Sequence, residues 1–141
     1  MLKFSLTIAA YVVVTLVVQA VSHFGINTAH YSSVSFLRPQ PIAVLGVLAS
    51  LIQGAALAYL FPYVRLRGSP MMQAVAFAWL AGAVLISYIA LVEAAKYSVP
   101  SVSAWTAVEF GSGFAQFTLF GLLLGLIQRS ASSSAASPAT P

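Results

Sequence analysis

LVEAAKYSVPSVSAWTAVEFGSG, residues 91–113, is the stretch that decides the fold predicted for this chain. It contains both acidic residues of the protein, Glu93 and Glu109, and joins two long apolar segments through a short turn around Pro100. Each apolar segment exceeds the roughly 20 residues that a helix needs to cross a bilayer. We therefore predict two antiparallel transmembrane helices with a carboxylate near each side of the turn.

The composition of the whole chain points the same way. Of its 141 residues, 60% are hydrophobic and only 6% are charged, whereas a soluble domain carries about 25% charge. The net charge of +4 comes from basic residues that stand singly between apolar runs, which is a topology signal and not a nucleic-acid patch. The absence of cysteine excludes disulfides, thiolate catalysis and Cys-ligated metals.

We predict an all-α integral membrane protein, a small bundle of four antiparallel transmembrane helices forming one domain over residues 1–129. The expected helices cover residues 2–24, 41–63, 71–95 and 103–128. Residues 130–141 are small and polar, and we expect a disordered tail. For the first helix a second interpretation stays open, a cleaved signal peptide with Lys3 before its apolar core and Val18-Gln19-Ala20 as the cleavage site.

Small side chains recur at helical spacing on three of these helices, and such ridges let helices approach closely in lipid. The ridges consist of Gly46, Ser50, Gly54 and Ala58; of Ala74, Ala78 and Gly82; and of Gly113, Gly121 and Gly125. They exceed what three internal contacts need. We therefore expect a homo-oligomer or a larger membrane complex, with the lipid bilayer as the other partner.

The basic residues predict the orientation. One side of the predicted membrane has four of them, Lys3, Arg65, Arg67 and Arg129, and the other side has two, Arg38 and Lys96. Because positive charge accumulates in cytoplasmic loops, both termini are expected in the cytoplasm, with a bacterial inner membrane as the location.

A group of polar residues then falls in the outer half of the bundle. Thr106, Glu109, Gly113 and Gln116 share one face of the last helix. The candidate polar site consists of Glu93, Glu109, Lys96, Arg38, Gln19 and His23. Two interpretations stay open: a pocket for a cation, a proton or an amine, or ion pairs that hold the helix ends together.

The other polar residues give weaker signals. His23 and His30 are weak candidates for metal ligands, but their spacing matches no ligand module, so neither a metal nor a cofactor is predicted. Gln53 and Gln116 lie at similar depth and predict a direct interhelical hydrogen bond. No nucleophile and base are suitably placed, so we do not expect an enzyme.

These observations favour a non-enzymatic accessory or packing subunit of a membrane assembly. The alternative is a small transporter or channel subunit that uses an outer site formed by Glu93 and Glu109.

Overall fold

The structure, a computed structural model, describes residues 1–38 and 40–129, and in these residues it is helical without a strand. The four long apolar helices that the sequence predicts are all present. They are α1 (Leu2–Val21), α3 (Ala43–Leu60), α4 (Pro70–Ser87) and α6 (Val102–Arg129). The expected tail, residues 130–141, lies outside the described residues.

Irregular helical turns extend three of these helices, so each of these three apolar spans is longer than its α-helix alone. The π-helical segment η1 (Ser22–Ile26) continues α1, the 3-10 turn η2 (Phe61–Tyr63) continues α3, and the π-helical segment η3 (Tyr88–Glu93) followed by α5 (Ala94–Lys96) continues α4. A short helix, α2 (Thr28–Ser32), follows η1. With these extensions all four helices are long and apolar enough to cross a membrane.

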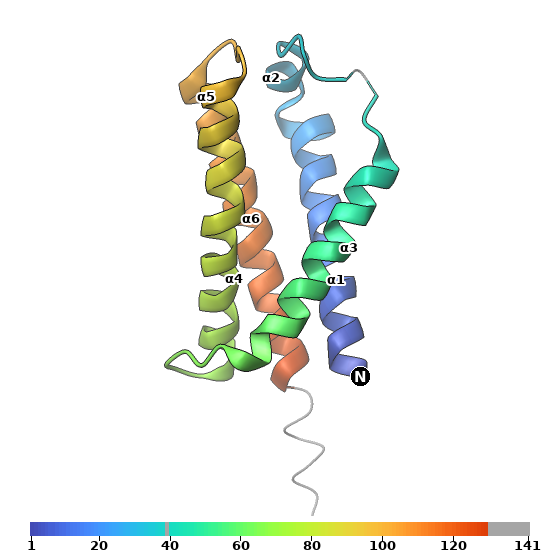
Figure 1. Ribbon diagram of the computed structural model, residues 1–141, viewed down its shortest axis with the longest axis vertical. Helices are drawn as coiled ribbons and strands as arrows, with labels where there is room; N and C mark the ends of the chain where they lie inside the picture. Colours follow the sequence, from blue (N-terminus) through green and yellow to red (C-terminus); the bar gives the residue numbers. More distant parts are fainter. Residues whose placement is uncertain (39, 130–141) are drawn as a thin grey trace, which may run out of the picture.

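The helices are arranged as two pairs, α1 with α3 and α4 with α6 (Figure 1). α4 packs along α6, and α1 packs against both α3 and α6, so α1 and α6 join the two pairs. α2 and α5 lie at one end of the bundle, and the N-terminus and the end of α6 lie at the other. At that second end Lys3 Nζ donates to the backbone oxygen of Gln128 over 3.1 Å.

Most of the predicted small residues pack inside the bundle, whereas Gly46 is exposed and an added Cβ there would meet nothing within 4 Å. Ser50, Gly54 and Ala58 are buried on α3, and an added Cβ on Gly54 would lie 3.4 Å from Ile8 of α1. On α6, a Cβ on Gly121 would lie 2.9 Å from the Cα of Val75 on α4. Assembly with other chains stays a prediction.

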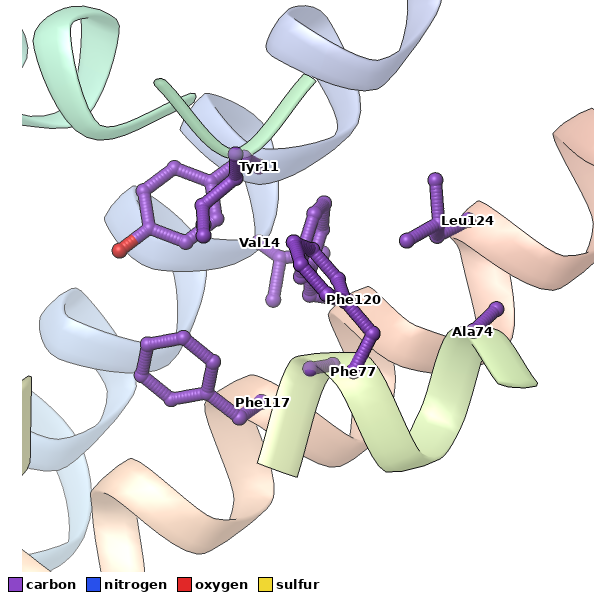
Figure 2. Close-up of a cluster of buried hydrophobic side chains, with 9 residues drawn as sticks. Tyr11, Val14, Ala74, Phe77, Phe117, Phe120 and Leu124 are labelled. Carbon is purple, nitrogen blue, oxygen red and sulfur yellow. The ribbon is translucent and has the colours of Figure 1, made fainter. Parts of the chain in front are cut away.

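The apolar core fills the half of the bundle near the N-terminus. The rings of Tyr11 from α1, Phe77 from α4, and Phe117 and Phe120 from α6 gather in one cluster (Figure 2). Tyr11 meets Phe120 edge to face, with the ring centroids 5.0 Å apart, a favoured geometry for aromatic pairs. This cluster joins the α1–α3 pair to the α4–α6 pair.

The α2/α5 end of the bundle is fixed through η3. Trp105 Nε1 donates to the backbone oxygen of Ile89, and Thr106 Oγ1 donates to that of Ala90, each over 3.2 Å. A π-helical turn breaks the regular α-helical ladder, and both of these carbonyls belong to η3. Side chains at the start of α6 therefore hold the irregular turn of its neighbour.

Replacement of Trp105 by Phe is expected to cost about 0.5–1.5 kcal/mol of unfolding free energy, because the part-buried hydrogen bond to the backbone oxygen of Ile89 is lost. Trp79→Phe provides the control, since Trp79 is 46% exposed whereas Trp105 is 3% exposed, and the indole of Trp79 donates to Thr118 on the surface. Unfolding in mixed micelles measures both. Equal losses for the two variants would show that the bond to η3 stabilises the protein no more than a hydrogen bond on the surface does.

Candidate functional site

A cavity of about 450 Å³ lies between the two helix pairs. Its polar lining comes from α1, α3, α6 and η3, and consists of Tyr11, Thr15, Gln19, Gln53, Tyr88, Glu109 and Gln116. The rest of its lining is apolar and consists of Val84, Leu85, Ile86, Ile89, Gly113 and Phe117. Four of these apolar residues belong to α4 and η3, so the cavity has a polar side and an apolar side.

A chain of side-chain hydrogen bonds organises the polar side. Gln116 Nε2 donates to Thr15 Oγ1 over 3.0 Å, and Gln116 Oε1 accepts from Gln19 Nε2 over 3.1 Å. Gln116 is 5% exposed, so both ends of a buried amide are paired, as burial requires. Nearby, Tyr11 Oη donates to Gln53 Oε1 over 2.7 Å.

The direct bond expected between Gln53 and Gln116 is not formed. Each glutamine bonds to a residue of α1 instead, because α1 is the helix that packs against both α3 and α6. Both glutamines nevertheless line the same cavity.

Glu109 is held at the α2 end of the cavity by a residue from outside the long helices. Tyr31 Oη on α2 donates to Glu109 Oε1 over 2.8 Å, and both side chains are buried. Burial, chiefly, and the neighbouring Glu109 carboxylate raise the pKa of Tyr31 well above its usual range, so its hydroxyl keeps its proton at neutral pH. The ring of His23 stacks on that of Tyr31, with centroids 3.6 Å apart.

The remaining candidate residues surround this arrangement unevenly. The Glu93 side chain is close enough to Glu109 and Lys96 for an electrostatic interaction with each. Lys96 Nζ lies 5.8 Å from the centroid of the Tyr88 ring. Arg38 is exposed and is not among the residues that line this cavity.

The two histidines do not join the carboxylates in a metal site. Within residues 1–38 and 40–129 no three His, Cys, Asp or Glu side chains converge on one point. His23 Nδ1 lies 3.0 Å from the backbone oxygen of Gln19. In those same residues, His30 Nε2 is the one fully buried side-chain polar atom without a hydrogen-bond partner.

Several residues that line the cavity were not predicted from the sequence. Tyr11 and Thr15 precede Gln19 at intervals of four residues, so they continue its polar face along α1, and that spacing was the available signal. Tyr31 gave no comparable signal, because it lies in a connector whose path depends on tertiary contacts. Glu109, Gly113 and Gln116 do share a face, as their spacing predicts, and all three line the cavity.

The cavity offers groups for binding. One carboxylate, three amides and three hydroxyls line it, and neither a histidine nor a lysine is among the lining residues. Such a lining can orient a ligand through hydrogen bonds while the apolar side packs against it. No protein-family model, curated protein or solved structure matches this chain.

Proposed function

We propose that this chain is a multi-pass protein of a bacterial inner membrane with both termini in the cytoplasm. Four apolar helices of sufficient length support insertion. The basic residues that flank them support the orientation, because one end of the bundle has more of them than the other. The end assigned to the cytoplasm has Lys3, Arg65, Arg67 and Arg129, and the opposite end has Arg38 and Lys96.

Within the membrane the chain binds a small molecule in the cavity and catalyses no reaction on it, as a small transporter or channel subunit. The cavity of about 450 Å³, polar on one side and apolar on the other, is the observation that carries this proposal. Its volume falls within the range of about 300–1,000 Å³ that is typical of ligand pockets. Polar groups buried at membrane depth are costly and mark substrate or ion pathways.

Thiol labelling tests whether the cavity admits small molecules. The chain has no cysteine, so a single Gln53→Cys variant places one thiol in the cavity. Ile52→Cys is the matched control, because Ile52 is the preceding residue and is 62% exposed on the outer surface of the bundle, where we expect lipid. The thiolate is the reactive species and forms poorly in apolar surroundings. N-ethylmaleimide should therefore modify Gln53→Cys at least about tenfold faster.

The protein is reconstituted in phosphatidylcholine nanodiscs and the modified fraction is followed by mass spectrometry. A closed or lipid-filled cavity would give both thiols the same slow rate, and the proposal would then be abandoned. Protection of Gln53→Cys, but not of Ile52→Cys, by an added solute would show that the solute occupies the cavity.

A further inference from the structure

Glu109 has one oxygen engaged and one free. Its Oε1 accepts the Tyr31 hydroxyl proton at 2.8 Å, and within the described residues its Oε2 has no hydrogen-bond partner. Oε2 is also absent from the fully buried unpaired atoms of that part of the chain, where His30 Nε2 stands alone. Glu109 is 7% exposed and lines the cavity between the helix pairs. The free oxygen is therefore accessible, and it belongs to a side chain that lines the cavity.

No positively charged residue is among those that line the cavity with this carboxylate. Glu109 is the one charged residue among those that line it. Glu93, the other acidic residue, interacts electrostatically with Glu109 and also with Lys96. Lys96 lies over the Tyr88 ring and is not among the lining residues. A carboxylate in low dielectric that lacks a counter-charge attracts a cation or a strong donor.

The shape of the cavity selects the kind of cation. A bare metal ion would be bound by several convergent ligands, usually including carboxylates, and no three His, Cys, Asp or Glu side chains converge in the described residues. The volume of about 450 Å³ far exceeds the size of an ion, and α4 and η3 contribute an apolar part of the wall, formed by Val84, Leu85, Ile86 and Ile89. That combination suits a molecule with a charged head and an apolar body.

We propose that the cavity binds an amphipathic organic cation whose ammonium group donates to Glu109 Oε2 and whose apolar part packs on the wall from α4 and η3. This inference rests on the proposed binding function and specifies the class of ligand. Gln53 and Gln19 lie on the polar side and can accept or donate further hydrogen bonds. Because hydrogen bonds between charged partners are about twice as strong as neutral ones, charge should dominate the selection.

The test compares two probes that differ mainly in charge, 2-phenylethylamine, which is protonated at pH 7, and uncharged 2-phenylethanol. Each is equilibrated by dialysis with the full-length protein in phosphatidylcholine nanodiscs, with empty nanodiscs as the background. The amine should bind about tenfold more tightly than the alcohol, a ratio that corresponds to 1.4 kcal/mol. Glu109→Gln should remove that preference while leaving the affinity for the alcohol unchanged.

Two matched variants separate the effect of the Glu109 charge from a general change in protein charge and from a general change in the cavity. Glu93→Gln removes the same charge from the protein as Glu109→Gln, and because Glu93 does not line the cavity, it should reduce amine binding only about twofold to threefold. Gln53→Leu should weaken both probes alike.

Equal affinity for the two probes, or an unchanged preference in Glu109→Gln, would overturn the inference. Either result would leave the proposed binding function intact if N-ethylmaleimide labels Gln53→Cys rapidly and 2-phenylethanol protects that thiol from labelling. Slow labelling of Gln53→Cys would remove both proposals together.

Discussion

Gly121→Ala is expected to destabilise the bundle by about 1–3 kcal/mol, the usual cost of forcing extra atoms into a close-packed core. The added methyl would lie 2.9 Å from the Cα of Val75 and 3.0 Å from the Cβ of Ala78, both on α4. A backbone carbon cannot rotate away as a flexible side chain does, so α4 and α6 would have to separate. In lipid this close contact is itself what holds two helices together.

Gly111→Ala on the same helix is the control. An added Cβ at Gly111 meets nothing within 4 Å, and both substitutions change helix propensity by the same amount. The difference in unfolding free energy between the two variants, measured in mixed micelles, therefore reports the α4–α6 contact alone. A difference near zero would mean that the two helices adjust to the methyl group without cost.

Tyr31→Phe is expected to cost about 2 kcal/mol, because hydrogen bonds to charged groups contribute about 1.5–3 kcal/mol. The variant removes the hydroxyl that donates to Glu109 Oε1 and leaves the Tyr31 ring position filled, so its stacking on His23 is retained. The loss should concentrate in α2, which Tyr31 anchors to α6, and should be visible as faster amide hydrogen exchange there.

A double-mutant cycle separates this bond from other effects of the substitutions. In a Glu109→Gln background the acceptor is neutral, so Tyr31→Phe should cost only about 0.5–1 kcal/mol. Tyr63→Phe is the control, since Tyr63 is 70% exposed, and it should be neutral in both backgrounds. Equal costs of Tyr31→Phe in the two backgrounds would show that the charge on Glu109 does not strengthen the bond.

The helices were predictable from the sequence because length and hydropathy alone specify them. The expected range 71–95 corresponds to Pro70–Lys96 and the expected range 103–128 to Val102–Arg129. Two features were not predictable. The π-helical segments η1 and η3 carry no marker in composition, and side-chain partners depend on which helices touch.

Gln53 illustrates the second difficulty. Depth in the membrane suggested Gln116 as its partner, but depth does not say which helix lies between the two. Once α1 is known to pack against both α3 and α6, Tyr11 becomes the nearer partner for Gln53. The carboxylates show the same limit, because sequence spacing placed Glu109 on a polar face but gave no sign that Tyr31 on α2 would occupy one of its oxygens.

The π-helical turn η3 also sets the angular position of every residue that follows it on this span. A residue advances about 100° around an α-helix, and a π-helical turn contains about one residue more than an α-helical turn. A return of this segment to regular α-helix with every residue kept would therefore rotate Ala94 and Lys96 by about 100° and remove Ala94 from the buried cluster that it shares with Trp105. Loss of one residue together with that return would leave both residues near their present positions. Hydropathy and composition would barely change. The alignment of this end of the bundle thus depends on whether these residues keep the π-helical turn, which neither hydropathy nor composition records.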